Sequence, residues 1–143
     1  MSALADLPRP IVFTNGVFDI LHRGHVEYLF DARKLGASLL VAVNSDDSTR
    51  LLGKGDDRPI NCEHDRALVV SSLSPVSAVL VFGEKTPLKI LNSFRPEIYV
   101  KGGDYDVENL PETPLVRSWG GRALTLSFRT GYSTTSLIQR ISR

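Results

Sequence analysis

The sequence predicts a doubly wound α/β fold, in which helices cover both faces of a mainly parallel sheet of about five strands. Short apolar runs alternate with helical patterns along the chain. These runs are continuous rather than alternating in polarity, as expected of strands that are covered on both faces. The 143 residues are 42% hydrophobic and 23% charged, so we expect one domain over residues 1–143, with residues 1–10 as an N-terminal extension.

The first predicted strand and helix stand next to each other. Residues 11–14 (IVFT) form a β-branched and aromatic run after two prolines, which predicts a buried strand that Asn15 and Gly16 end. Apolar residues recur with helical spacing from His25 onward, and Gly36 stands where a helix commonly stops. This segment therefore predicts a strand, a loop and a helix in succession.

The same pattern repeats through the rest of the chain. The polar residues 45–61 are the longest candidate loop, and loops of this length in compact domains are often functional. The further predicted strands are residues 39–43, 76–82, 98–100 and 123–128, and the further predicted helices are residues 63–73, 87–94 and 133–141.

Charge and cysteine content narrow the classes of partner and the compartment. The 17 basic and 16 acidic side chains leave a net charge of +1, so we expect small-molecule partners and no nucleic acid. Cys62 is the single cysteine, which excludes an internal disulfide and is consistent with a reducing compartment. Because no apolar stretch approaches the length of a membrane span and the first ten residues lack an export pattern, we expect a cytoplasmic protein without membrane partners.

Residues 16–25 (GVFDILHRGH) carry the strongest chemical signal. They lead from the first strand into the first helix at the carboxyl edge of the sheet, where open α/β folds bind ligands. Gly16 lets backbone amides approach a phosphate, and Gly24 leaves no side chain between His22 and His25. The histidines are three residues apart, so on a first helical turn they point the same way. Two imidazoles beside helix amides suit a triphosphate and the charge that develops during its cleavage.

The alternative is structural. Either histidine alone would more often be a helix cap or a packed side chain than a ligand-binding group. The combination of His22, Gly24 and His25 with the preceding strand favours the functional interpretation.

Two later segments bring polar groups towards the same edge. Lys101 follows a predicted strand and precedes two glycines, so it projects a cation over the edge unless it is simply solvated. Asp104 accepts hydrogen bonds from ribose hydroxyls, orients Lys101, or only forms a turn. Ser133 and Thr134 begin the last predicted helix, where hydroxyls cap the helix by default and can also meet a phosphate.

Five stretches resemble the nucleotidyltransferases of the His-x-Gly-His superfamily, which are Rossmann-like enzymes. They are GVFDILHRGHVEYL, VAVNSD, DDRPIN, VKGGDY and GYSTT, and the likeness covers residues 11–141. Within the superfamily, the chain is most similar to the branch that acts on D-glycero-β-D-manno-heptose 1-phosphate. The resemblance implies transfer of the adenylyl group of ATP, with Mg²⁺, to that sugar phosphate. The products would be pyrophosphate and ADP-heptose for lipopolysaccharide core synthesis, and relatives commonly form homodimers.

The resemblance also implies roles for residues. His22 and His25 would hold the triphosphate and stabilise the transition state, and Lys101 would neutralise the phosphates as a third catalytic residue. Ser133 and Thr134 would bind the phosphates from the last helix. The other nucleotide-binding residues would be Asn15, Gly16, Val17, Phe18, Gly24 and Asp104.

The acceptor-binding residues are predicted from the loop after the second strand. Lys54, Arg58 and Arg66 can clamp the acceptor phosphate or the leaving pyrophosphate, although most loop cations are only solvated. Arg58 ranks first because the DDRPIN stretch matches the heptose branch, and Arg66 ranks above Lys54. Asp46 either contacts the sugar or only ends its strand.

Two alternatives remain open. The first is a cytidylyltransferase that acts on glycerol 3-phosphate or a similar small phosphate. Such relatives carry an Arg-Thr-x-Gly-Ile-Ser-Thr signature, and aligning this chain on Gly131 puts Phe128 in the place of their arginine, which weakens that alternative. The second is a noncatalytic nucleotide-binding module, against which the intact His22, His25 and Lys101 argue.

Other patterns predict no chemistry. Cys62 and the histidines lack the spacing of zinc ligands, so no metal site made by the protein is predicted. Trp119 beside two glycines is interpreted as an anchor at a helix end, packed on the core.

Overall fold

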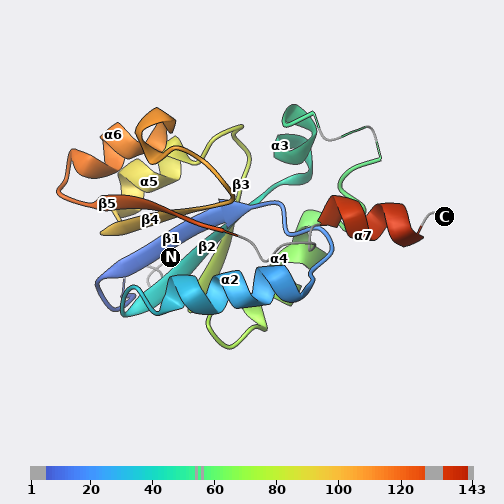
Figure 1. Cartoon of the computed structure of the whole chain (residues 1–143), viewed down its shortest axis with the longest axis horizontal. Helices are drawn as coiled ribbons and strands as arrows, with labels where there is room; N and C mark the ends of the chain where they lie inside the picture. Colours follow the sequence, from blue (N-terminus) through green and yellow to red (C-terminus); the bar gives the residue numbers. More distant parts are fainter. Residues whose placement is uncertain (1–5, 54, 56, 128–133, 142–143) are drawn as a thin grey trace.

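A computed structural model describes residues 6–53, 55, 57–127 and 134–141 of the chain. Its centre is a five-stranded sheet with the order β3-β2-β1-β4-β5, in which every neighbouring pair is parallel (Figure 1). The predicted doubly wound sheet of about five strands is therefore confirmed. The strands are β1 (Ile11–Gly16), β2 (Ser38–Asn44), β3 (Ala78–Phe82), β4 (Ile98–Gly102) and β5 (Arg122–Leu126).

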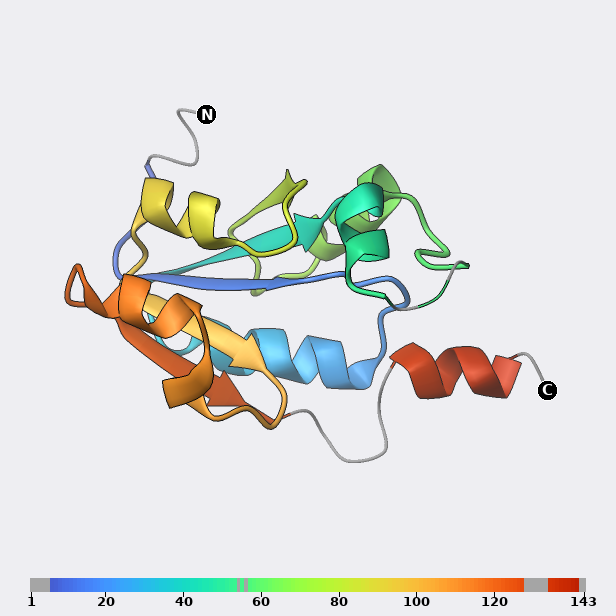
Figure 2. The same cartoon turned by 90° about the horizontal axis from the view of Figure 1, so that it is seen from above.

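Helices cover both faces of the sheet, as predicted. Figure 1 shows α5 and α6 above the strands and α2 below them, and Figure 2, seen from above, shows the strands spread side by side across the sheet. One buried cluster joins α2 and α4 to the sheet, and a second cluster joins α5 and α6 to its opposite face. The helices are α2 (Arg23–Arg33), α3 (Asp46–Leu51), α4 (Glu63–Ser71), α5 (Leu88–Phe94), α6 (Glu112–Arg117) and α7 (Thr134–Ile141), with a 3₁₀ turn, η1, at Val107–Asn109.

The central strands explain why apolar runs dominate the sequence. All seven residues of β2 are buried, and its neighbour β1 is buried over its first four residues. Strands that are covered on both faces bury every side chain, which is why their sequences do not alternate in polarity. Because α2 ends at Arg33, Gly36 lies in the turn into β2. A side chain at Gly36 would come within 2.6 Å of the carbonyl oxygen of Pro10, so this close approach to β1 requires glycine.

The structure contains two helices that the sequence pattern did not predict. The predicted loop of residues 45–61 begins with α3, which Ser45 caps by accepting a hydrogen bond from the Ser48 amide at 3.0 Å. The second helix, α6, lies between β4 and β5. Trp119 follows α6 and donates its indole proton to the Pro96 carbonyl oxygen at 2.8 Å, which confirms the predicted anchor. Within the described ranges, the chain has no helix long and apolar enough to cross a bilayer.

Candidate active site

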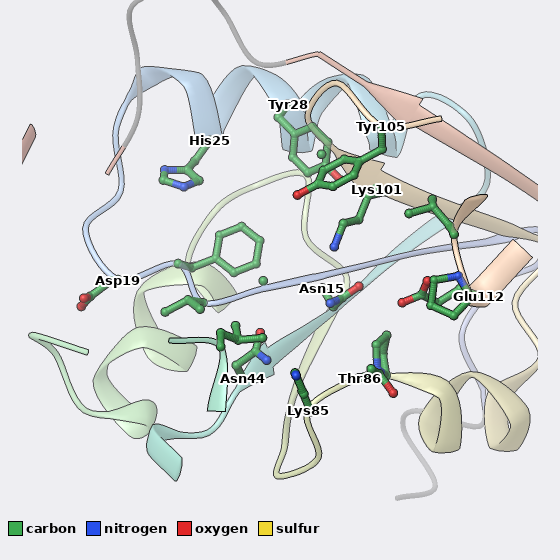
Figure 3. Close-up of a pocket in the computed structure, with 18 of the residues that line it drawn as sticks. Asn15, Asp19, His25, Tyr28, Asn44, Lys85, Thr86, Lys101, Tyr105 and Glu112 are labelled. Carbon is green, nitrogen blue, oxygen red and sulfur yellow. The ribbon is translucent and has the colours of Figure 1, made fainter. Parts of the chain in front are cut away.

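The carboxyl ends of the parallel strands border a large pocket, which has a volume of about 610 Å³ (Figure 3). This is the edge at which open α/β sheets bind ligands, and the volume lies in the range of small-molecule sites. Residues from the ends of β1, β2 and β4 line it, together with the segments that follow β3 and β4. The residues that line this pocket include Asn15, Gly16, Val17, Phe18, Asp19, His22, His25, Asn44, Arg58, Lys85, Thr86, Lys101, Tyr105 and Glu112.

Both predicted histidines line the pocket, and both also cap α2. His22 Nδ1 accepts a hydrogen bond from the Gly24 amide at 3.0 Å, and His25 Nδ1 accepts one from the His22 amide at 3.2 Å. The ring centroids are 4.1 Å apart. A nitrogen that accepts an amide proton carries no proton itself, so each neutral ring bears its proton on Nε2. The predicted capping role is therefore filled by the Nδ1 atom of each ring. The Nε2 atom of each ring carries the proton and is a hydrogen-bond donor.

Burial keeps the first of these rings uncharged. It lowers the pKa of His22 below its ordinary value of 6.5. At neutral pH the His22 ring is therefore a neutral donor rather than a cation.

The turn between β1 and α2 is tightly constrained. Phe18 is buried and has a left-handed backbone, with φ of 51°, which is uncommon for a residue other than glycine. Its ring centroid lies 5.6 Å from that of His25, and a side chain at Gly16 would come within 3.0 Å of the Phe18 ring. Such backbone strain is characteristic of functional sites. Glycine at position 16 thus lets the Phe18 ring pack between β1 and the His25 imidazole.

Asp19, which the sequence analysis did not single out, fixes the later loop to this turn. Its buried carboxylate accepts hydrogen bonds from Arg58 Nε at 2.9 Å and from the amides of Ile60 and Asn61 at 2.8 and 2.9 Å. Arg58 was predicted to bind the acceptor. It does line the pocket, but its Nε atom is paired with Asp19 inside the protein.

Arg66 lies at the centre of a second internal network. Its side chain is buried, and it donates to the carbonyl oxygens of Asn61, Val17 and Asn44 and to the Asp46 carboxylate, over distances of 2.7 to 2.9 Å. These contacts join the β1 turn, the end of β2 and the start of α4. Neither Arg66 nor Asp46 lines the large pocket, so the structure does not bring these two predicted residues together with the histidines.

Lys101 reaches the pocket from the end of β4, as predicted. Its ammonium nitrogen lies 5.0 Å from the ring centroid of Tyr105, which also lines the pocket. Gly103 has φ of 117°, and a side chain there would come within 2.9 Å of the Tyr105 ring. Asp104 is exposed, accepts a hydrogen bond from Ser127 Oγ at 3.2 Å and does not line the pocket.

Several lining residues escaped the sequence analysis. Lys85 and Thr86 follow β3, and the rule that parallel strands bring their carboxyl ends to one edge could have selected them. Asn44 could have been selected by the same rule, because it lies at the carboxyl end of β2. No sequence pattern could have identified Glu112, because it begins a helix that was not predicted.

Three predicted residues cannot be placed. Lys54 and Ser133 lie outside the described residues, and so does the side chain of Thr134. The described part of the chain contains no group of three or more His, Cys, Asp or Glu side chains that could hold a metal ion.

Comparisons with known proteins point to one family. The model of the cytidylyltransferase-like family matches residues 13–140. D-beta-D-heptose 1-phosphate adenylyltransferase of Bordetella bronchiseptica is 58% identical over 139 residues, which are 97% of this chain and 86% of that protein. Bifunctional protein HldE of Cronobacter sakazakii is 49% identical over 133 residues, which are 93% of this chain but only 28% of that protein.

A solved structure extends the likeness to three dimensions. The lipopolysaccharide core biosynthesis protein from Thermoplasma volcanium superposes with a TM-score of 0.73 at 32% identity, covering 83% of this chain and 97% of that one. The two proteins therefore share one fold over most of their length.

Proposed function

Because the chain belongs to the cytidylyltransferase-like family, we propose that it transfers the adenylyl group of ATP to D-glycero-β-D-manno-heptose 1-phosphate, giving ADP-heptose and pyrophosphate. The likeness to the Bordetella adenylyltransferase supports both substrates. The observation that carries the chemistry is the meeting of His22, His25 and Lys101 in one pocket at the carboxyl edge of the sheet. Neither the cytidylyl alternative nor the noncatalytic module is favoured by these findings.

The proposed step is an in-line displacement at the α-phosphorus of ATP. A phosphate oxygen of the sugar 1-phosphate forms the new P–O bond, and the bond from the α-phosphorus to the bridging oxygen breaks, so that pyrophosphate leaves with that electron pair. A phosphate monoester has a second pKa of about 6 and is already largely dianionic at neutral pH, so no general base is needed. The protein has to align two anions and stabilise the charge that develops.

The pocket supplies groups suited to that task. The Nε2 protons of His22 and His25 are directed donors for phosphate oxygens, and the Lys101 ammonium neutralises charge at the transferred group. Their hydrogen bonds to the α2 backbone fix the two rings before substrate binds. Mg²⁺ belongs to the proposal as part of the MgATP substrate, bound to the phosphate oxygens.

The remaining roles are also part of this proposal. Residues 15–18 and Gly24 line or adjoin the nucleotide, and Asp104, Ser133 and Thr134 complete its site. Lys54 contacts the acceptor, whereas Arg58, Arg66 and Asp46 act on it by holding the surrounding segments in place. A cytoplasmic homodimer is the expected form of the protein.

A pyrophosphate-release assay tests donor and acceptor together. The protein is incubated with ATP or CTP against heptose 1-phosphate, hexose 1-phosphates and glycerol 3-phosphate. We expect the highest kcat/KM for ATP with the heptose phosphate. A preference for CTP with glycerol 3-phosphate would support the cytidylyl alternative, and nucleotide binding without pyrophosphate release from any pair would support the noncatalytic module.

A further inference from the structure

Glu112 is a buried carboxylate whose hydrogen bonding is incomplete. It is the first residue of α6, is only 5% exposed and lines the large pocket. Its Oε2 atom has no hydrogen-bond partner within the part of the chain that the structure describes. Burying such an atom without a partner costs free energy, so an unsatisfied acceptor beside a ligand pocket points to a donor on the ligand.

The neighbouring side chains do not complete the hydrogen bonding of this carboxylate, because among the described residues its Oε2 atom is left without a partner. The Tyr99 hydroxyl donates to Asn15 Oδ1 at 3.1 Å and also interacts with the Glu112 side chain. Burial, then the negative charge of Glu112 and a hydrogen bond with it, raise the pKa of Tyr99, so this hydroxyl stays protonated and neutral. Among the described residues, no lysine or arginine forms an ion pair with Glu112.

Asp19, the other acidic residue of the pocket, provides a contrast. Arg58 and two backbone amides satisfy both of its carboxylate oxygens. Among the described lining residues, Glu112 is therefore the acidic side chain with an acceptor atom left for a ligand.

The in-line geometry of the displacement indicates which substrate lies beside Glu112. Figure 3 shows His25 and Glu112 at opposite ends of the pocket, with Lys101 and Asn15 between them. In phosphoryl and nucleotidyl displacements the attacking and leaving oxygens lie on opposite sides of the phosphorus. If the histidines hold the leaving pyrophosphate, the acceptor approaches from the end that Glu112 lines.

The negative charge of Glu112 restricts which groups of the acceptor it can bind in the pocket. A carboxylate repels phosphate groups and accepts hydrogen bonds from hydroxyls, and its two oxygens can accept from adjacent hydroxyls of one sugar. We propose that Glu112 binds hydroxyl groups of the acceptor sugar and so selects a polyhydroxylated phosphate. This inference rests on the proposed function and names the part of the acceptor that the site recognises.

The test compares Glu112→Gln with the parent and with Glu108→Gln. Glu108 is a matched control because it is an exposed glutamate paired with Arg117 on the surface. Pyrophosphate release is measured with ATP and heptose 1-phosphate, each varied in turn. We expect Glu112→Gln to lower kcat/KM for the sugar phosphate by about tenfold to a hundredfold, the usual effect of losing hydrogen bonds to a charged group, with KM for ATP changed by less than about twofold. Glu108→Gln should match the parent.

Calorimetric binding of heptose 1-phosphate makes the result independent of turnover. We expect the affinity of Glu112→Gln to fall by about the same factor, while a deoxy analogue lacking a contacted hydroxyl binds the parent and the variant alike. Parental affinity and kinetics in Glu112→Gln, or a rise in KM for ATP alone, would overturn the inference and leave the proposed function intact. A parent without turnover would instead overturn the proposed function, and the binding comparison would still decide the role of Glu112.

Thermal unfolding checks that the variant is folded. Because Glu112→Gln removes a buried charge that lacks a full set of partners, we expect its Tm to equal or exceed that of the parent. A lower Tm together with unchanged sugar binding would assign Glu112 to the fold instead of the ligand.

Discussion

The arginines and the lysines around the pocket are used in opposite ways. Arg66 is buried and donates hydrogen bonds to three carbonyl oxygens and one carboxylate, and Arg58 is paired with the buried Asp19. Lys85 and Lys101 line the pocket, and within the described chain neither forms an ion pair. The arginines therefore hold the segments that form the pocket, and the lysines are available to substrate phosphates.

The chemistry of the two cations explains the difference. A guanidinium presents five donors in a rigid plane, which lets one side chain join several loop carbonyls. An ammonium group is a compact charge on a flexible stem, which suits a phosphate that binds and leaves. The contrast predicts that arginine substitutions affect stability first, whereas lysine substitutions affect turnover first.

The largest effect is expected from Lys101→Met. Loss of a cation at the transferred phosphoryl group should lower kcat by about 10²- to 10³-fold, as removal of one preorganised donor typically does. The free energy of unfolding should stay at the parental value. Pyrophosphate release and urea unfolding measure the two quantities, with Lys34→Met, an exposed lysine at the end of α2, as the control. Parental turnover in Lys101→Met would remove the distinction between the two kinds of cation.

A smaller effect, on stability, is expected from Arg66→Met. The change leaves three carbonyl oxygens and the Asp46 carboxylate without their donor, which should lower the free energy of unfolding by about 3 kcal/mol. Urea unfolding measures it, with Arg50→Met as the control because Arg50 pairs with the exposed Asp47 on the surface. Unchanged stability together with weaker binding of the sugar phosphate would instead support the prediction from sequence that Arg66 binds the acceptor directly.

The smallest effect concerns pH. Burial lowers the pKa of His22 in the folded protein below 6.5, so as the pH falls the unfolded chain binds this proton first. The contribution of His22 to the free energy of unfolding is constant above pH 6.5. It is lost as the pH falls below that value, until the ring in the folded protein is also protonated. The variant His22→Asn keeps a helix cap and should show a flatter slope of unfolding free energy over that window. An equal slope in parent and variant would contradict the assignment.

The sheet and the histidine motif could be predicted from sequence because both are local patterns. Continuous apolar runs mark β1 and β2, and the motif lies where a strand passes into a helix. Most partners of Arg58 and Arg66 could not be predicted, because Asp19, Val17, Asn44 and Asp46 lie 20 to 49 residues away along the chain and meet these arginines only in the folded protein. Glu112 was missed because α6 has only six residues, too few to show a clear helical period.

The central claim is that the Nε2 atoms of the paired imidazoles act on the phosphates. His25→Asn tests it most directly, since an asparagine oxygen can replace Nδ1 as the acceptor for the His22 amide while Nε2 is lost. Pyrophosphate release and ATP affinity are measured together in this variant. We predict that turnover falls by about 10²- to 10³-fold while ATP affinity changes by less than about tenfold. Parental turnover with intact ATP binding would contradict the account.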